Sequence, residues 1–569
     1  MKRKTSYLLG LLLVTGSLLR SGIAQSKPAE TTAPLVDITA STGIHFQHLS
    51  SPEQRFIVES MSGGVALLDF DGDGWLDIYF TNAPSVSMAL AGKPARGALY
   101  RNNHDGTFTD VSDKAGVATP CWAMGAAVGD IDNDGWPDLA VSCFGGVILY
   151  RNNHDGTFTD VTKKSGLNID KGWATGLAFG DYDGDGFVDL FVPHYVDLDL
   201  EHLPVFGSQK TCAYHEVPVQ CGPRGLKGSP DALYHNNGDS TFTDVSAAAG
   251  VDDPQRFFGL QAVWSDFDQD GKLDLFVAND GEPNFLYRNQ GGGRFQEVAN
   301  EAGVSLSENG DEQANMGVAI GDYTRTGRES IAISHFSEDY AILYRNEGAL
   351  NFTDVAHSAR VAQSTVPYVG WGDAFLDTAN RGLLDLIVVN GHVYPQVDNA
   401  KLATTYKEPK LLFSNNGDGT FRDVSADSPA LQVRQVSRGL AVGDLFNTGH
   451  LNVVIENLTG EPMILETRPD PKNHWVSFQL EGTTSNRLAL NARVTVRTGK
   501  VQQMSEVLSG GSYLSQSDLR LHFGLGASTT LDAIIVHWPD GTEQTFEHLP
   551  ADRFYHLKEG GAPSPQLIR

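Results

Sequence analysis

The sequence is poor in basic residues. Its 569 residues include 42 lysines and arginines against 70 aspartates and glutamates, and the formal net charge is −28 at pH 7. A protein that binds the phosphates of nucleic acid needs a basic surface, so this charge argues against nucleic acid as a partner. The hydrophobic content of 40% is nevertheless sufficient for a folded core, which argues against global disorder.

Long apolar segments are also missing, except close to the N-terminus. Residues 1–24 have the pattern of a secretory signal peptide, with basic residues at 2–4, an apolar stretch at 7–14 and small residues at 22–24. The alternative, a membrane anchor, requires about 20 apolar residues, and polar residues such as Arg20 interrupt this stretch. We therefore expect a cleaved signal peptide, a secreted or periplasmic (cell-envelope) location, and no transmembrane segment in the mature chain.

Recognisable catalytic motifs are absent as well. The glycine-rich stretches at 62–64, 291–293 and 509–511 do not form a Gly-x-Ser-x-Gly nucleophile elbow, and there is no phosphate-binding loop. The 17 histidines are scattered, and His104 and His154 occupy the same place in two hairpin turns, which indicates inheritance through a repeat rather than ligation. The sequence therefore predicts no catalytic residue, and an enzyme is the less favoured interpretation.

Cysteine is scarce, but its number is even. Four cysteines in an exported chain favour disulfides. Cys212 and Cys221 bracket a short loop that contains proline, and we expect them to pair. Cys121 and Cys143 lie on opposite arms of one hairpin, where they either face each other as a disulfide or remain as two buried thiols. No Cys-x-x-Cys motif accompanies them, so a zinc site is not indicated.

In contrast, one acidic motif is abundant. Asp-x-Asp-x-Asp-Gly-x-x-Asp occurs four times, each time between two apolar runs. Four carboxylates within nine residues repel one another unless a cation lies among them, and alternating oxygen ligands with a glycine at the bend are typical of calcium sites. We expect a backbone carbonyl at position seven to complete each site. The predicted side-chain ligands are Asp69, Asp71, Asp73, Asp77, Asp130, Asp132, Asp134, Asp138, Asp181, Asp183, Asp185, Asp189, Asp266, Asp268, Asp270 and Asp274.

Three further loops are degraded copies of this motif. They begin at Asp322, Asp377 and Asp444, and they keep the glycine and the apolar flanks but lose most of the carboxylates. We expect them to keep the hairpin without calcium, so the predicted number of Ca²⁺ sites is about four. The EF-hand shares the first half of the motif, but its loop ends with Glu at position twelve and lies between helices. Here the last Asp is at position nine and the flanks are short apolar strands, which disfavours an EF-hand.

Each acidic loop belongs to a longer repeat. Apolar strands precede and follow the loop, a third strand has the form LYRNN, as at 99–103, and a fourth has the form TFTDV, as at 107–111. Seven loops but only six such fourth strands occur, and residues 35–44 match the missing one. An N-terminal strand of this kind closes the ring of a β-propeller. The predicted fold class is all-β: a seven-bladed β-propeller over 35–467, closed by an N-terminal strand, followed by a small C-terminal β domain over 472–558.

Two further features concern one face of this propeller. Residues 195–230 interrupt the third repeat, and we expect a disulfide-stapled excursion of the kind that often carries recognition. A mostly polar set of residues stands thirteen positions after the start of each acidic loop. Its members either end the strands through a repeated hydrogen bond or form a ring that faces a substrate, with His194 and His335 as working members. The set is Asn82, Cys143, His194, Asn279, His335, Asn390 and Asn457.

These motifs resemble a known family. The acidic repeats resemble the FG-GAP (VCBS) repeats of integrin-α-type propellers, and the stretch SGGSYLSQSDLRLHFGLG at 509–526, with WPDG at 538–541, resembles an ASPIC/UnbV domain. Together they resemble the cartilage acidic protein family. One departure lies at 488–492, where the chain reads LALNA in place of the glycine-bearing family pattern, so a ligand role of the missing acid does not carry over. The asparagine there can adopt the left-handed backbone that glycine usually supplies.

Two interpretations of function follow from this sequence. The preferred one is a secreted calcium-binding protein that acts as an extracellular recognition or adhesion module for a protein or glycan ligand, without turnover. The alternative is an exported enzyme or biosynthetic accessory protein with its site on the propeller face near the 195–230 insertion. Convergence of His194, His202, His215 and His335 in space favours the alternative, and their dispersal favours the first.

Overall fold

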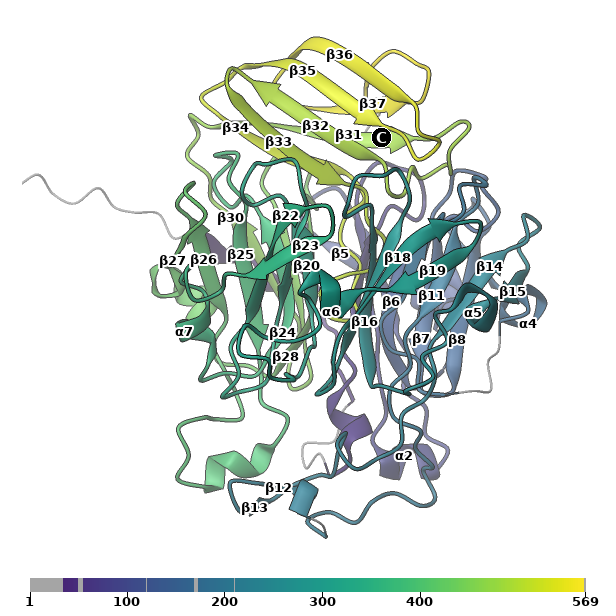
Figure 1. Ribbon diagram of the computed structural model, residues 1–569, viewed down its shortest axis with the longest axis vertical. Coiled ribbons are helices and arrows are strands. Elements are labelled where there is room, and N and C mark those ends of the chain that lie inside the picture. Colours follow the sequence, from purple (N-terminus) through teal and green to yellow (C-terminus); the bar gives the residue numbers. More distant parts are fainter. Residues whose placement is uncertain (1–33, 50–54, 119, 168–171, 209, 567–569) are drawn as a thin grey trace, which may run out of the picture. The chain divides into compact units, whose positions relative to one another are not determined.

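The computed structural model describes residues 34–49, 55–118, 120–167, 172–208 and 210–566, and residues 33–569 belong to one compact unit. The predicted signal peptide at 1–24 lies outside the described residues. Strands dominate the described part of the chain, so the all-β prediction is confirmed (Figure 1). None of the helices described there combines the length and the apolar character that spanning a membrane requires.

Seven four-stranded antiparallel sheets fold from the described residues between 35 and 467. Each of the first six follows chain order from its first to its fourth strand. The sheets are β2 (Val65–Leu68), β3 (Asp77–Phe80), β4 (Ala98–Asn102), β5 (Phe108–Asp110); β6 (Ala123–Gly129), β7 (Asp138–Cys143), β8 (Gly146–Asn152), β9 (Phe158–Asp160); β10 (Ala178–Gly180), β11 (Asp189–Val192), β14 (Ala232–Asn236), β15 (Phe242–Asp244); β16 (Gly259–Ser265), β17 (Asp274–Asn279), β18 (Phe285–Gly291), β19 (Arg294–Glu297); β20 (Val318–Gly321), β21 (Ser330–Ile333), β22 (Ile342–Gly348), β23 (Asn351–Asp354); β24 (Gly370–Leu376), β25 (Asp385–Asn390), β26 (Leu411–Asn415), β27 (Phe421–Asp423); and β28 (Ser437–Gly443), β29 (Asn452–Asn457), β30 (Met463–Thr467), β1 (Leu35–Asp37).

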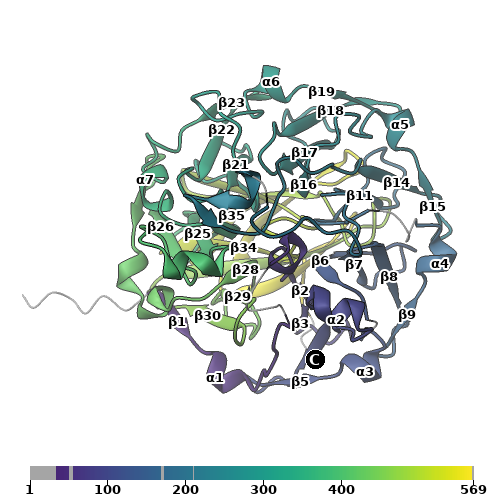
Figure 2. The same ribbon diagram turned by 90° about the horizontal axis from the view of Figure 1, so that it is seen from below.

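The N-terminal strand completes the seventh sheet. β1 pairs antiparallel with β30, with Leu35 opposite Thr467 and Asp37 opposite Leu465. The first strands of the seven sheets contact one another in sequence, and β2 contacts β28 where the ring closes (Figure 2). Because the two ends of the repeat region share one sheet, the ring leaves no open edge between its first and last repeats.

Short helices follow the outer strands. Several of them end at a glycine with a left-handed backbone, such as Gly116 at φ 78°, which explains the Ala-Gly pair after many TFTDV motifs. These helices are α1 (Thr39–Thr42), α3 (Ser112–Ala115), α4 (Thr162–Ser165), α5 (Ser246–Ala249), α6 (Ala299–Ala302) and α7 (Ala362–Thr365), the last of which ends at Val366 instead of a glycine; α2 (Val86–Leu90) lies between β3 and β4.

One asparagine in most repeats joins neighbouring sheets. Asn102, at the end of β4, donates from Nδ2 to the carbonyl of Leu445, in the acidic loop of the seventh repeat, at 2.8 Å. The equivalent residues reach the same carbonyl of the preceding repeat: Asn152 to Phe70, Asn236 to Ile131, Asn289 to Tyr182, Asn346 to Phe267 and Asn415 to Tyr323. The first Asn of the LYRNN motif is therefore a buried bridge between sheets, and it also holds the closing pair together.

The C-terminal part contains two more four-stranded sheets. Their strands are β31 (His474–Glu481), β34 (Leu521–Gly526), β37 (Arg553–Lys558) and β38 (Ser564–Pro565) in one, and β32 (Arg493–Thr498), β33 (Val501–Glu506), β35 (Thr530–His537) and β36 (Glu543–Pro550) in the other. Between β33 and β34 the chain runs into the middle of the ring, and we call residues 507–520 the channel segment. Gln516 there pairs with Ala66 of β2, and Ser512 pairs with Val318 of β20. The domain boundary near 467–472 stays a prediction. The channel segment follows this boundary in the sequence, but it pairs with strands of the ring.

A glycine recurs on or next to the inner strands of the ring, and at Gly64, Gly125 and Gly439 it makes room for the channel segment. Six of the seven repeats have glycine five residues before the first loop Asp: Gly64, Gly125, Gly176, Gly317, Gly372 and Gly439. A Cβ at Gly64 would lie 2.1 Å from the Leu514 carbonyl oxygen, and one at Gly125 would lie 2.8 Å from the Leu514 Cβ. The fourth repeat has Gln261 instead, and its Oε1 accepts the backbone N–H of Leu514 at 3.0 Å.

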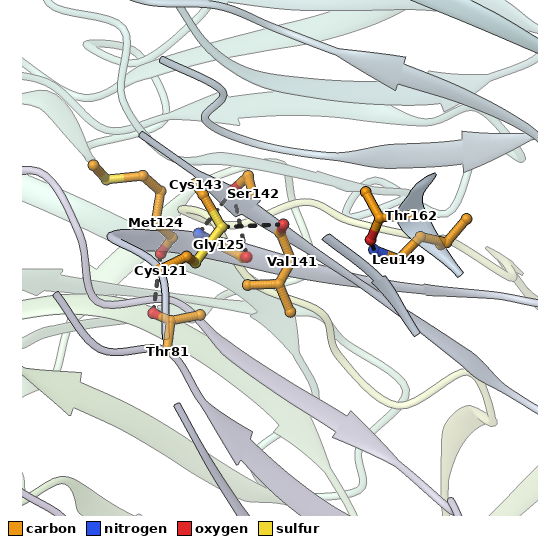
Figure 3. The surroundings of a disulfide bond; sticks show 9 residues. All are labelled: Thr81, Cys121, Met124, Gly125, Val141, Ser142, Cys143, Leu149 and Thr162. Carbon is orange, nitrogen blue, oxygen red and sulfur yellow. Dashed lines mark hydrogen bonds between the residues drawn. A yellow bond between two sulfur atoms is a disulfide. The ribbon is translucent and has the colours of Figure 1, made fainter. Parts of the chain in front are cut away.

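The predicted Cys212–Cys221 disulfide is present, and Cys121 and Cys143, for which the sequence left a disulfide and two free thiols open, also form a disulfide. Cys121 and Cys143 bond next to the inner end of the second sheet, with Cα atoms 6.1 Å apart, and Ser142 beside them hydrogen-bonds Gly125 (Figure 3). Cys212 and Cys221 bond with Cα atoms 4.2 Å apart. The second bond closes the insertion between β11 and β14, which also holds the short hairpin of β12 (Ala213–Tyr214) and β13 (Val217–Pro218).

Candidate metal centre

The first Asp of every acidic loop organises the loop itself. Asp69 accepts the backbone N–H groups of Asp73 and Gly74 at 3.0 and 2.9 Å, so its carboxylate closes the turn. Asp130, Asp181 and Asp266 accept the equivalent pairs in the other three full loops. This position therefore combines a structural role with its predicted role as a metal ligand.

The ninth residue ties the loop to the third strand. Asp77 accepts the N–H of Phe70 inside the loop and the N–H of Asn102 at the end of β4. Asp138 and Asp189 make the same two contacts in their repeats. All three carboxylates are buried, so loop and sheet hold them in place before any ion binds.

The structure brings positions one, three and nine together in all four full loops. In each loop, one carboxylate oxygen from each of these positions lies within 4.8 Å of the other two. Two oxygens that bind one calcium ion at about 2.4 Å are at most about 4.8 Å apart, so this spacing fits calcium. The three-residue groups are Asp69, Asp71, Asp77; Asp130, Asp132, Asp138; Asp181, Asp183, Asp189; and Asp266, Asp268, Asp274.

Position five lies outside these groups of three and has partners of its own. Asp73 accepts the N–H of Trp75, and its other oxygen lies 2.7 Å from His104 Nε2. The His104 ring stacks on Trp75 with centroids 4.8 Å apart. Asp134, His154 and Trp136 repeat the arrangement in the second loop. The repeated histidines therefore hold the fifth carboxylate, a role that the sequence did not reveal.

Burial makes these loops unfavourable places for bare negative charge. Desolvation is the largest cause in each case, and neighbouring carboxylates add to it. It raises the pKa of Asp69 and Asp181 to about 6, of Asp130 and Asp189 to about 7, and of Asp274 to about 8. A divalent cation would remove this penalty by pairing with the charged form.

Within the described part of the chain, between one and three basic side chains pair with the carboxylates of each full loop, and the fourth loop has three, Lys272, Arg288 and Arg493. Arg101 pairs with Asp71 and Asp73, Arg151 with Asp132, and Arg288 with Asp268, while His235 faces Asp183 in the third loop. These arginines and the histidine all come from the third position of the LYRNN-type motif. Single buried oxygens of Asp71, Asp132 and Asp274 still have no hydrogen-bond partner. Four carboxylates in each loop, with an unpartnered buried oxygen in three of the four loops, fit a cation site.

The three degraded loops fold in the same way without most of the acids. Asp322 accepts the N–H groups of Thr326 and Gly327, both at 2.8 Å. Asp377 and Asp444 repeat this pattern. In the sixth loop, Arg381 Nη2 reaches Asp385, so a protein cation pairs with the ninth carboxylate. The first Asp alone thus preserves the turn.

The predicted polar ring is largely used for local hydrogen bonds. Asn279 donates to the carbonyl of Pro283 at 2.7 Å, Asn390 to that of Pro409 at 2.7 Å and Asn457 to that of Glu461 at 2.9 Å. Cys143 is in a disulfide. These bonds support the strand-ending interpretation over a ring that faces a substrate.

The four histidines that bear on the enzyme alternative have separate surroundings. His202 pairs with Asp199 and is largely exposed, and His215 pairs with Glu338 and is about half exposed. His194 and His335 are buried. No hydrogen bond between any two of the four is seen within the described part of the chain.

Comparison with protein families supports the repeat assignment. The FG-GAP-like repeat model matches residues 69–141, 130–192 and 266–333, and the ASPIC and UnbV model matches residues 482–564. These ranges contain all four full acidic loops, the degraded loop that begins at Asp322 and most of the C-terminal strands, but not the degraded loops at Asp377 and Asp444.

Curated relatives match over most of the chain. Cartilage acidic protein 1 from Mus musculus is 24% identical over 502 residues, which cover 84% of this chain and 70% of the mouse protein. The Homo sapiens protein of the same name is 24% identical over 503 residues, covering 84% and 69%.

Solved structures with distant similarity include an Agrocybe aegerita lectin that recognises non-reducing terminal N-acetylglucosamine. It is 18% identical with a TM-score of 0.36, and the match covers 64% of this chain and 79% of the lectin chain. They also include BBS1N in complex with ARL6DN, at 10% identity and a TM-score of 0.41; the match covers 77% of this chain and 98% of that chain.

The family models and the curated relatives together confirm the resemblance to the cartilage acidic protein family, with FG-GAP-like repeats followed by an ASPIC and UnbV segment.

Proposed function

We propose that this chain is a secreted calcium-binding protein that serves as an extracellular recognition or adhesion module for a protein or glycan ligand. The observation that carries the calcium assignment is the grouping of carboxylates from positions one, three and nine within 4.8 Å in all four full loops. The proposal places one Ca²⁺ in each, with the ligands completed by position five and a backbone carbonyl. Extracellular modules bind calcium with dissociation constants on the order of 0.1 to 1 mM.

The position of the loops supports a structural role for this calcium. Every side-chain ligand of a site comes from one loop, and two of the four positions also hold the hairpin together. A metal bound in this way has little room for a substrate and would act by stiffening the sheet ends. Two disulfides and the similarity to cartilage acidic protein 1 support an oxidising, extracytoplasmic location.

The calcium assignment is tested with Asp132→Ala. This side chain occupies position three, and its carboxylate makes neither of the turn contacts seen at positions one and nine. We expect calorimetry to find about four calcium ions per chain in the unaltered protein and about one fewer in the variant. The variant should melt at a lower temperature in calcium and at an unchanged temperature in chelator. Asp113→Asn, an exposed acid outside the loops, is the control.

The recognition role requires a separate experiment. Immobilised mature protein is exposed to an envelope extract and to a glycan panel, first in millimolar calcium and then in chelator. Calcium-dependent retention of one discrete protein or glycan supports the module. Retention of none, with calcium still raising the melting temperature, would leave calcium as a structural ion and remove the recognition role.

A further inference from the structure

The insertion at 195–230, which the Cys212–Cys221 disulfide closes, lies across one face of the propeller. This is the face opposite the acidic loops. On one side, the Tyr214 hydroxyl lies 3.0 Å from Ser337 Oγ, and His215 Nε2 lies 2.8 Å from Glu338. On the other side, Gln220 donates to Ser60 Oγ at 2.8 Å. Figure 1 shows β12 and β13 beyond the ends of β16, β24 and β28, away from β31 to β37. The insertion is thus anchored at several points and forms a roof.

A cavity of about 360 Å³ lies beneath this roof. Its apolar wall contains four aromatic residues from four different segments, namely Tyr195, Phe336, Trp371 and Tyr394. Trp371 and Tyr195 are buried in one hydrophobic cluster, whereas Phe336 and Tyr394 pack against this cluster and are partly exposed. A volume of roughly 300 Å³ or more is typical of sites for small molecules or for a single inserted side chain.

The polar part of the lining is acidic. Asp280, Glu312 and Asp339 contribute carboxylates, and Arg224 is the one Lys or Arg side chain that lines the cavity. Arg224 is largely exposed, and its Nη2 lies 3.8 Å from Glu312. Asp280 accepts the hydroxyl of Tyr195. Neither Asp280 nor Asp339 forms an ion pair with another described residue, so two carboxylates inside the cavity have no bound counter-charge.

Burial affects both of these carboxylates. It raises the pKa of Asp280 to about 6, although the Tyr195 hydrogen bond and the charge of Arg224 oppose the shift. It also raises the pKa of Asp339. A cationic ligand would stabilise the charged form of each group, because an opposite charge at close range offsets the desolvation penalty.

We infer that this cavity binds an organic cation, a primary ammonium or guanidinium group on an apolar stem, as in a lysine or arginine side chain. Such a group has hydrogen-bond donors and no acceptor, which suits a lining of carboxylates. Aromatic faces attract the same charge, and the stem packs against apolar side chains such as Met316. The inference names a ligand class for the proposed recognition role and therefore depends on it, but it uses none of the sixteen loop aspartates.

The test is calorimetric titration of the full mature chain in calcium with three small probes. They are the Nα-acetyl amides of lysine, arginine and norleucine, the last being the uncharged analogue of lysine. We expect at least one cation to bind about tenfold or more tightly than the norleucine compound, because only the cation can pair with the acids. Asp280→Asn and Asp339→Asn should each weaken that binding about tenfold. Butylamine, which has the same head group without a peptide backbone, shows whether the free amine suffices.

Glu201→Gln removes the same charge from an exposed site on the insertion and should leave binding unchanged. The inference is overturned by no binding of either cation up to about 10 mM, a limit that covers weak ligands of this size. Equal binding of the norleucine compound, binding that both Asp variants leave intact, or binding of N-acetylglucosamine in place of the cations also overturns it. Calcium occupancy of the four loops is measured in the same samples, so this inference and the calcium proposal can fail separately.

Discussion

The hydroxyl of Tyr513 donates a hydrogen bond to the backbone carbonyl of Met61 at 2.6 Å, across 452 positions of the sequence. Tyr513 is fully buried, and its ring meets Trp371 edge to face with centroids 4.7 Å apart. Arg438 covers Trp371 at 3.9 Å, so the tip of the channel segment packs on residues from three propeller sheets or their connections. The C-terminal part and the propeller thus share one hydrophobic core around Tyr513.

Removing this hydroxyl should destabilise the whole chain. In Tyr513→Phe, the Met61 carbonyl loses its donor in a buried site, which costs about 1–3 kcal/mol. We expect chemical denaturation to show that loss in a single transition reported equally by the propeller and the C-terminal strands. Tyr368→Phe, which removes the same atom from a less buried tyrosine, is the control. Unchanged stability, or two separate transitions, would contradict a shared core.

The close approach at Gly64 gives a second prediction. In Gly64→Ala, the new Cβ would lie 2.1 Å from the Leu514 carbonyl oxygen, a backbone atom that cannot move aside cheaply. Overpacking of this kind costs about 1–3 kcal/mol or more. Gly561→Ala is the matched control, because the nearest atom to its Cβ is 3.2 Å away and the residue lies near the end of the chain. Similar unfolding free energies for the two variants would show that the channel segment is not held tightly.

Loss of an aspartate from a degraded loop should lower stability equally in calcium and in chelator, unlike the same loss from a full loop. Asp322→Ala removes the acceptor of two backbone N–H groups in a loop to which we assign no calcium. We expect a loss of about 1–3 kcal/mol, equal in calcium and in chelator, with the number of bound calcium ions unchanged. Asp132→Ala is the opposite case, with a loss seen only in calcium. A drop in calcium stoichiometry for Asp322→Ala would add a fifth metal site and contradict the assignment.

The repeat features were predictable from the sequence because they are local and periodic. The acidic loop, the LYRNN strand and the closing strand at 35–37 each repeat a pattern that the chain shows several times. The Cys212–Cys221 disulfide was predictable because the two cysteines are near in sequence, whereas the sequence left open whether Cys121 and Cys143 pair across their hairpin. For the site, the acids themselves were predictable, whereas the engagement of the fifth Asp by His104 was not, because that contact depends on a hairpin 31 residues away.

The channel segment could not be predicted in the same way. The glycine before each loop was visible as a repeated position, and Gln261 as its one exception. At Gly64, Gly125 and Gln261, however, the neighbour is the channel segment, which lies some 250 to 450 residues further on. Periodicity reports which residues share an environment, but it does not identify a distant segment that enters that environment. The cavity beneath the insertion has the same origin, since its lining residues come from separate repeats.

Acid should destabilise the fold through His392. This ring is fully buried, and Nδ1 accepts the backbone N–H of Tyr394 at 3.0 Å, so the neutral form is required. Burial, with the charge of Arg438, lowers its pKa to about 3. The folded-state pKa of His392 lies below the unfolded value of about 6.5, so its contribution to the free energy of unfolding is fully present above pH 6.5. Between pH 6.5 and the folded-state pKa, this contribution falls by about 1.4 kcal/mol for each pH unit.

His392→Asn isolates this contribution, because an asparagine Oδ1 can accept the same N–H and does not titrate. We expect urea unfolding between pH 7 and pH 4.5 to show a shallower acid decline in the variant, by about one proton. Buried carboxylates such as Glu408, with a raised pKa of about 8, act with the opposite sign, but they are common to both proteins and cancel in the difference. His202→Gln, at a largely exposed site, should leave the slope as it is. Parallel pH profiles for His392→Asn and the unaltered protein would show that His392 accepts its proton in the folded state without penalty.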